Sequence, residues 1–418
     1  MHTIAQRLGK KIYYGWVMVA VSALGLFFSA PGQTYSISVF RNIWSEEFGY
    51  SSSLLSSGYL VATLLSGSLL VFMGKLVDRF GQRKMMMVVA FLLAMTAFYN
   101  SYVANAAMIF VGFFLLRYFG QGSMTLIPHS LVPQWFDKKR AFAMSLENFG
   151  GLIATMSVPA INYWVITQVG WENTFRLWGI ALLVIFIPIV FVTVINKPED
   201  IGLQIDGEQN GDEAIQEANE WLEKESFTLK ETIRTKEFWF IGLMSVIVPM
   251  FSTGITFHFF DMMAERNVDN QTASVIIGLI APPAFLMPFV ARALIDRYEP
   301  KYIFFMTQIL IFIAMIWLAF FVRGPLSAAG FILFYGVAVG IQVVTLNTIW
   351  PTYFGRKYLG SIRGAAQVFM VFSTAIGPLP LALSYDYLGD FNYAIFAMMG
   401  MTLFSMVMAL SIKRPIKQ

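Results

Sequence analysis

Twelve apolar stretches of about 20 residues each run the length of this 418-residue chain, separated by short polar segments. A hydrocarbon core about 30 Å thick needs about 20 apolar residues per helix, so each stretch is long enough to cross a bilayer. The predicted spans are 13–39, 52–73, 85–105, 107–132, 141–168, 173–195, 236–262, 271–294, 301–322, 325–350, 361–387 and 391–413. Charged residues make up only 13% of the chain, against about 25% in a soluble domain. The pattern predicts an all-α membrane protein with twelve transmembrane helices.

The basic residues are distributed unevenly between the two sides of the predicted membrane. With the N-terminus placed inside, 24 of the 29 Lys and Arg residues lie in cytoplasmic segments, four lie outside and one, Arg117, lies within a span. Cytoplasmic loops carry such an excess of positive charge. We therefore expect a multi-pass protein of the cell membrane with both termini cytoplasmic, and the pI near 9.0 reflects topology rather than a nucleic-acid partner.

A polar, acidic segment interrupts the apolar pattern midway along the chain. It covers residues 196–235 and is rich in glutamate between Glu199 and Glu225. It could be a regulatory or docking loop, or a solvated linker with a short surface helix around 212–225, and we favour the linker. The expected domains are an N-terminal six-helix bundle (1–195), a cytoplasmic linker (196–235) and a C-terminal six-helix bundle (236–418).

The two halves of the chain are related in sequence. At a constant offset of 218 residues the identities are Leu76/Leu294, Asp78/Asp296, Arg79/Arg297, Gly122/Gly340, Pro133/Pro351, Phe136/Phe354 and Lys139/Lys357. A shift of one residue then aligns Gly170 with Gly389. The repeat predicts two pseudo-symmetric bundles.

A short basic loop follows the second span. It contains Gly74, Asp78, Arg79, Gly81 and Arg83 in the pattern G-x-x-x-D-R-x-G-x-R, and a degenerate copy runs from 292 to 301. The loop resembles the one between the second and third helices of major facilitator superfamily transporters. The resemblance implies the major facilitator fold, with parallel repeats and a solute site near the midplane between the halves. It also implies a monomer that binds a small molecule within the lipid bilayer.

In that superfamily the loop acid acts as a conformational latch. The eleventh span should begin at Ser361, and a helix N-terminus carries about half a positive charge that attracts a carboxylate such as Asp78. Glycines and arginines of the motif, Gly74, Arg79, Gly81 and Arg83, would complete the latch. The alternative is that Asp78 and Arg79 only mark the cytoplasmic end of a helix.

Arg117 is the basic residue placed deepest within a span. A charge inside the membrane is costly and should face a partner or a watery cavity. The run Arg117-Tyr-Phe-Gly-Gln121-Gly resembles the arginine-and-glycine motif of the superfamily's fourth helix. Arg117 either binds an anionic solute or controls a proton site, or it is a structural residue that bonds backbone carbonyls; both interpretations stay open.

Glu147, two turns into the fifth span, is the carboxylate most clearly within the membrane. A poorly hydrated carboxylate can exchange protons near neutral pH, so Glu147 is a candidate proton-coupling residue. Alternatively, it pairs with the basic 138–140 loop or with His129.

Uncharged polar residues in otherwise apolar helices complete the candidate solute site. Each one alone is more often an interhelical hydrogen bond than a ligand contact. Together with Arg117, the candidate substrate-binding residues are Gln33, Tyr35, Gln121, His258, Gln342, Asn347 and Gln367.

The sequence contains no arrangement typical of an enzyme. It has three histidines and no cysteine, and it lacks the HExxH, phosphate-loop and serine-elbow motifs. We expect no cofactor and no metal site. Because the phosphate loop of ATP-driven pumps is missing, the energy should come from an ion gradient, with H⁺ as the expected ion, or from solute exchange.

Four short motifs resemble the bacterial monocarboxylate porter and oxalate–formate exchanger branch: Tyr14-Gly-Trp, Gly32-Gln-Thr-Tyr35, Thr235-Lys-Glu-Phe-Trp239 and the segment from Tyr353 to Gly364. The branch's arginine in span eight is replaced here by Pro288, and the exchangers' lysine in span eleven by neutral residues around Phe372. Both departures weaken the case for a dicarboxylate.

We therefore expect a secondary active transporter of a small organic solute, such as a monocarboxylate or another organic anion, that works by ion-coupled alternating access. Two alternatives remain. One is an exporter of amphipathic drugs or metabolites, although residues 150–160 lack the Gly-Pro antiporter motif. The other is a solute sensor with a transporter fold, which would not need the Asp78–Arg79 latch.

Overall fold

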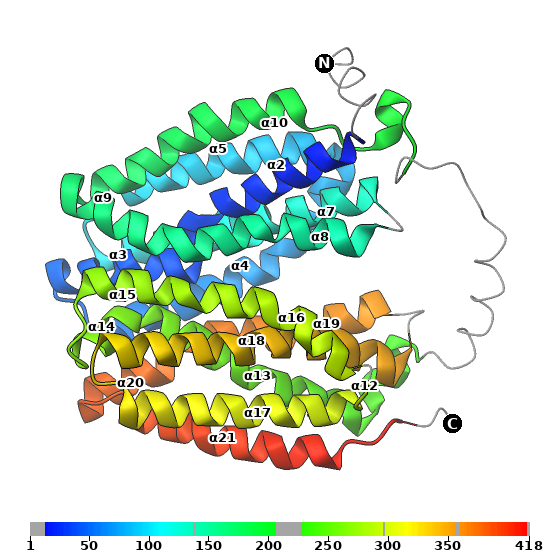
Figure 1. The fold of residues 1–418 in the computed structure, drawn as a ribbon. Helices are drawn as coiled ribbons and strands as arrows, with labels where there is room; N and C mark the ends of the chain where they lie inside the picture. Colours follow the sequence, from blue (N-terminus) through cyan, green and yellow to red (C-terminus); the bar gives the residue numbers. More distant parts are fainter. Residues whose placement is uncertain (1–12, 137–138, 206–226, 296, 356–358, 416–418) are drawn as a thin grey trace. The chain divides into compact units, whose positions relative to one another are not determined.

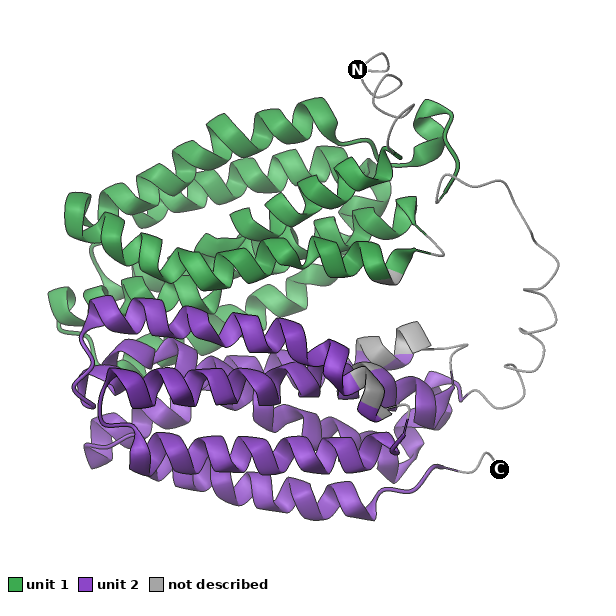
Figure 2. Ribbon diagram, in the orientation of Figure 1, with its two compact units in different colours: residues 1–210 green, residues 211–418 purple. Residues whose placement is uncertain are grey.

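Helices form all of the regular structure in the described part of the chain. The computed structural model describes residues 13–136, 139–205, 227–295, 297–355 and 359–415 (Figure 1). Contacts divide the chain into two compact units, Met1–Asn210 and Gly211–Gln418 (Figure 2). The helix expected around 212–225 lies outside the described residues.

The first unit contains six predicted spans built from interrupted helices. Its elements are α2 (Gly15–Phe28), η1 (Ala30–Gly32), α3 (Thr34–Phe48), α4 (Ser52–Phe80), α5 (Gln82–Asn100), α6 (Ala106–Leu115), η2 (Leu116–Ser123), α7 (Met124–Trp135), α8 (Arg140–Glu147), α9 (Phe149–Ala181), η3 (Leu182–Phe186), α10 (Ile187–Thr193) and η4 (Pro198–Ile201).

The second unit begins with a short helix that the apolar pattern did not predict. Its elements are α12 (Leu229–Arg234), α13 (Lys236–Phe257), α14 (Phe259–Ala264), α15 (Asn270–Ile276), η6 (Ile277–Ile280), α16 (Ala281–Ile295), α17 (Pro300–Ile316), η7 (Trp317–Phe321), α18 (Pro325–Phe354), α19 (Leu359–Ile376), α20 (Pro378–Leu388) and α21 (Asn392–Ser411). Thr228 and Glu231 form a capping box at the start of α12, a sequence signature that could have revealed it.

Ten helical stretches within the described residues are long and apolar enough to cross a membrane. One of them, Phe142–Thr193, contains two predicted spans, and Gly170 breaks it with a φ of 84°. Helix α5 falls outside the ten because it begins with Gln-Arg-Lys and ends with Tyr-Asn. The chain is a multi-pass membrane protein, and the count of twelve spans stays a prediction.

The first span extends nine residues beyond its predicted end at 39, because the polar residues that close the apolar window are buried. Arg41 is 1% exposed and donates a hydrogen bond to Ser52. Phe40 stacks on Phe175 of α9 with ring centroids 4.0 Å apart, and Trp44 lies parallel to the same ring at 5.9 Å. Packing therefore continues helix α3 to Phe48.

The internal repeat is visible in how each unit packs. A Cβ added at Gly122 would lie 2.6 Å from Leu70 of α4, and one added at Gly340 would lie 2.8 Å from Met287 of α16. The second and fourth spans of each unit therefore approach closely at equivalent positions. Gly170 and Gly389 also correspond: both have a positive φ, 84° and 73°, at the last turn between spans.

Candidate functional site

A break in the first span meets a π-helical turn of the fourth. The short 3-10 turn η1 interrupts the span after α2, and η2 carries the residues from Arg117 to Gln121. A Cβ on Gly120 would lie 2.7 Å from the Cα of Gly32, so the two backbones touch only because both residues are glycines. The predicted break at Pro31-Gly32 is present, and it positions Arg117.

Arg117 is buried, with 4% of its surface exposed, and neutral groups surround it. Its Nη1 donates to Oγ1 of Thr34 at 3.3 Å, and its guanidinium carbon lies 4.9 Å from the centre of the Tyr59 ring. The hydroxyl groups of Thr34 and Tyr59 are 2.8 Å apart. Within the described residues no carboxylate pairs with Arg117, and its Nε has no hydrogen-bond partner. A buried cation without a counter-ion is unfavourable, so the site is electrostatically suited to an anion.

Three other predicted site residues lie on or next to the helical segments that meet here. Gln33 follows η1 directly, and its Nε2 donates to Oγ of Ser29 at 2.9 Å. Tyr35 packs against a buried cluster that contains Ala154 and Val158 of α9. Gln121 has a buried Oε1 with no partner among the described residues. The structure therefore brings together four residues predicted from sequence, namely Gln33, Tyr35, Arg117 and Gln121. Sequence reasoning missed Thr34 and Tyr59, since hydroxyl side chains carry no signal of their own.

The predicted residues of the second unit are more scattered. Gln342 on α18 is 2% exposed, and neither of its side-chain polar atoms has a partner within the described residues. His258 is completely buried, and its Nε2 lies 3.0 Å from the backbone oxygen of Pro378. The side chains of Asn347 and Gln367 lie outside the described residues.

Glu147 ends α8 with no exposed surface, and it lies beside His129 of α7, which is 40% exposed. The Oε1 of Glu147 and the Nδ1 of His129 are 3.1 Å apart, but the two groups are not oriented to form a hydrogen bond. The structure thus joins the carboxylate to one of the partners expected for it.

The latch motif divides into two parts. Gly81 ends α4 with a φ of 83°, and the backbone nitrogen of Arg83 donates to Oδ1 of Asn196 at 2.9 Å. The Arg83 guanidinium donates to the Phe191 backbone oxygen at 2.6 Å, so this part fastens α5 to the end of the sixth span. By contrast, Asp78 is exposed and has no partner among the described residues, as expected for a group free to bind elsewhere.

The other motif residues make few contacts. Arg79 is exposed, and its guanidinium carbon lies 5.3 Å from the centre of the Phe80 ring. A Cβ on Gly74 would meet nothing within 4 Å. The side of α4 that carries Gly74 is therefore open.

The repeated helical units, membrane-spanning stretches and buried cation define a membrane transport protein. Comparison with known families confirms this class. The family model described as "Major Facilitator Superfamily" matches residues 22–378, so the chain belongs to this superfamily. It is a transporter and not an enzyme.

Three relatives and solved structures illustrate the similarity. The chain is 23% identical over 265 residues to the uncharacterized MFS-type transporter YhjX of Escherichia coli, covering 60% of each protein. It is 25% identical over 173 residues to human monocarboxylate transporter 14, covering 41% of this chain and 33% of that one. A bacterial homologue of the lysosomal transporter Spinster, solved inward-facing and unoccupied, superposes with a TM-score of 0.73 at 12% identity over 95% of this chain and 96% of that one. This last likeness shows the fold alone.

Proposed function

We propose that this protein is a secondary active transporter of a small organic anion that works by alternating access. The observation that carries the proposal is Arg117, a buried guanidinium bonded only to neutral groups among the described residues. A carboxylate can accept two parallel hydrogen bonds from such a group. The proposed substrate contacts are Arg117, Gln121, Gln33 and Tyr35 in the first unit, and His258, Gln342, Asn347 and Gln367 in the second.

The proposal is tested by screening solutes for stabilisation of the purified protein. A ligand that binds only the folded protein stabilises it by RT ln(1 + [L]/Kd), so the melting temperature rises with ligand concentration. We expect organic monocarboxylates to stabilise the protein and their uncharged amides not to do so. Stabilisation by amides and carboxylates alike would refute an anion site.

An exporter of amphipathic compounds is the second candidate. It is favoured by an apolar groove of about 420 Å³ between α4 and α6, lined by residues such as Gly58, Val61 and Phe110. The chain is also 20% identical over 329 residues to multidrug resistance protein MdtL of Klebsiella pneumoniae, covering 78% of this chain and 79% of that protein. Under this alternative, neutral amphiphiles would stabilise the protein and Arg117 would not affect them.

We propose H⁺ as the coupling ion, with Glu147 as a coupling residue. Glu147 is fully buried and accepts no hydrogen bond from the described residues. Such a carboxylate is costly as an ion and is well suited to carrying a proton. Replacing Glu147 with Gln, which stays neutral, should stop solute-driven proton movement in proteoliposomes while solute exchange continues. Undiminished proton movement would exclude Glu147 from coupling.

The latch proposal gives Asp78 a role in transport and Arg83 a role in stability. Asp78→Asn should leave the melting temperature unchanged but slow transport, because the charge that would stabilise one state is lost at a cost of about 0.3–1 kcal/mol. Arg83→Gln, the matched control in the same motif, should instead lower stability by about 0.5–1.5 kcal/mol, since it removes the bond to the Phe191 oxygen. Normal transport by Asp78→Asn would rule out the latch.

We also propose that the protein acts as a monomer in the cell membrane with both termini in the cytoplasm. The chain contains no cysteine, so single cysteines report topology directly. Cysteines at Tyr102 and Leu326, which are 65% and 89% exposed, should react with an impermeant thiol reagent in intact cells. Cysteines at Asp200 and Lys413 should react only after permeabilisation; the reverse pattern would invert the proposed orientation.

A further inference from the structure

His258 occupies a break in the seventh span that also contacts the eleventh. It ends α13 and precedes α14, with φ and ψ of −102° and 12°. Its buried Nε2 lies 3.0 Å from the backbone oxygen of Pro378, the first residue of α20. One turn earlier, a Cβ on Gly254 would lie 2.6 Å from the backbone oxygen of Gly377. The imidazole therefore links two spans where their backbones are in close contact.

The surroundings of the ring fix where its hydrogen must be. The Pro378 oxygen can only accept a hydrogen bond, so Nε2 carries the hydrogen in the neutral ring. Nδ1 would then present a lone pair toward Oδ2 of Asp261, which lies 3.7 Å away. Two acceptors facing each other in a buried place are unfavourable, and one added proton turns the contact into an ion pair.

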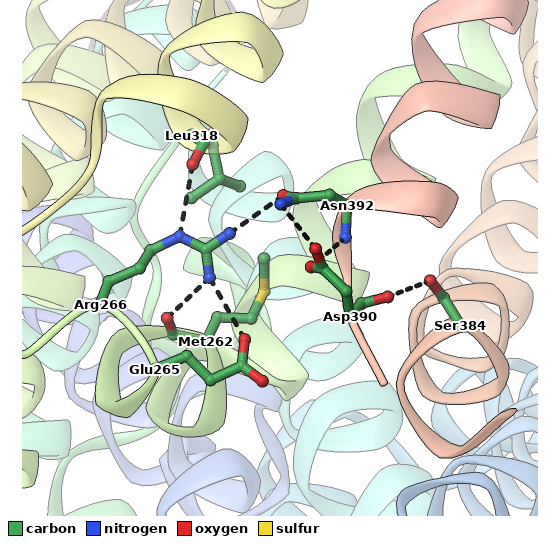
Figure 3. A network of polar contacts seen from close by, with 7 residues as sticks. All are labelled: Met262, Glu265, Arg266, Leu318, Ser384, Asp390 and Asn392. Carbon is green, nitrogen blue, oxygen red and sulfur yellow. Dashed lines mark hydrogen bonds and ion pairs between the residues drawn. The ribbon is translucent and has the colours of Figure 1, made fainter. Parts of the chain in front are cut away.

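A polar network lies along the chain from this pair (Figure 3). Arg266, which is 8% exposed, donates to the backbone oxygen of Met262 at 2.9 Å and to Oδ1 of Asn392 at 3.1 Å. Its Nη1 is 3.6 Å from a carboxylate oxygen of Glu265. The backbone and side-chain nitrogens of Asn392 both donate to Asp390. The guanidinium of Arg266 thus contacts Glu265 directly and is linked to Asp390 through the side chain of Asn392.

The charge balance of this end of the second unit is negative. Burial raises the pKa of Glu265, Arg266 opposes that rise, and the negative charges of Asp390 and Asp261 add to it. Glu265 and Asp390 interact with Arg266, and Asp261 adds a further negative charge near Glu265. Titratable groups on the elements packed around His258 include Asp261, Glu265, Arg266 and Asp269 on and after α14, Tyr335 on α18, Tyr385, Asp386 and Tyr387 on α20, Asp390 before α21 and Tyr393 on α21. The carboxylate of Asp261, 3.7 Å from Nδ1, favours a proton on His258.

We propose that His258 and Asp261 together form a site for one exchangeable proton in the second unit. Asp261 is 21% exposed and so can pass the proton between water and the buried ring. With the proton bound, His258 donates one hydrogen to Pro378 and the other to Asp261, which holds the seventh and eleventh spans together. Without the proton, Asp261 repels the Nδ1 lone pair and this hold weakens. Coupling of this proton to solute movement rests on the proposed function. Binding of the proton does not depend on it.

The test is a pH titration of histidine-labelled protein by nuclear magnetic resonance. The chain has only three histidines, so His129→Gln and His2→Gln assign the His258 signal by elimination even if His258→Gln does not fold. We expect His258 to change between neutral and charged forms between about pH 5 and 8. Asp261→Asn should weaken its proton binding at least tenfold, whereas Asp269→Asn, an exposed carboxylate at the start of α15, should leave it unchanged. The proposed site would be overturned if His258 stays neutral over this pH range, or if Asp261→Asn does not change its proton binding.

The coupling role has a separate readout. Transport by His258→Gln, whose amide can still donate to Pro378, should show an altered dependence on pH, with Glu147 still present, while the melting temperature stays close to that of the wild type. An unchanged pH dependence would refute coupling through this site. Because the titration needs no solute, a failure of the proposed function would not alter its result.

Discussion

Replacing Arg117 with lysine should weaken the binding of an organic anion by about 1.5–3 kcal/mol, the typical contribution of a charged hydrogen bond. The planar guanidinium can hold a carboxylate through two parallel hydrogen bonds, and the ammonium group of lysine cannot reproduce that geometry. The positive charge is kept, so the protein should still fold with a similar melting temperature. Affinity and thermal stability should be measured on the same preparation.

A structural role for Arg117 predicts the opposite pattern. Its bond to Thr34 and its position over the Tyr59 ring would then hold the fourth span to the first and second spans, and lysine would lower stability without changing affinity. Arg176→Lys is a matched control, since this arginine also lies over an aromatic ring, that of Tyr102 at 5.0 Å. It should leave anion affinity unchanged.

Substituting alanine for Gly150 should destabilise the first unit by about 1–3 kcal/mol or more, as overpacking of a well-packed contact does. A Cβ at this position would overlap the backbone oxygen of Ala23, which belongs to α2 and cannot move aside as a side-chain end could. Gly151, the next residue of the same helix, has nothing within 4 Å of its added Cβ. Gly151→Ala should therefore keep or slightly raise stability, because alanine favours helix.

Thermal unfolding of the two alanine variants, purified in the same detergent, measures the difference. If α2 and α9 approach as closely as described, the melting temperature of Gly150→Ala should be clearly lower than that of Gly151→Ala. Equal melting temperatures would mean that these two helices do not pack as described.

The fold was largely predictable because the membrane imposes it. Apolar stretches of fixed length, the asymmetry of basic residues and the loop from Gly74 to Arg83 all agree, and the family and fold they indicated are confirmed. The predicted end of the first span was wrong, because Arg41 is buried by contacts with residues that lie outside any hydropathy window around it.

The site was predictable only in part. Arg117 stands out in the sequence because charge within a span is rare, but its neutral partners Thr34 and Tyr59 are ordinary residues 83 and 58 positions away. The sequence singled out His258 but did not reveal that its nitrogens face Asp261 and an oxygen of Pro378, which is 120 residues distant. Such pairings come from tertiary contacts, and periodicity does not encode them. The solute-binding roles stay predictions.

The most direct test of an anion transporter is uptake by proteoliposomes of a carboxylate and of its uncharged amide, driven by an imposed proton gradient. Wild-type protein should accumulate the carboxylate and not the amide, and Arg117→Lys should need a much higher carboxylate concentration for the same rate. Equal uptake of both solutes, with the same concentration dependence in wild type and Arg117→Lys, would contradict the account.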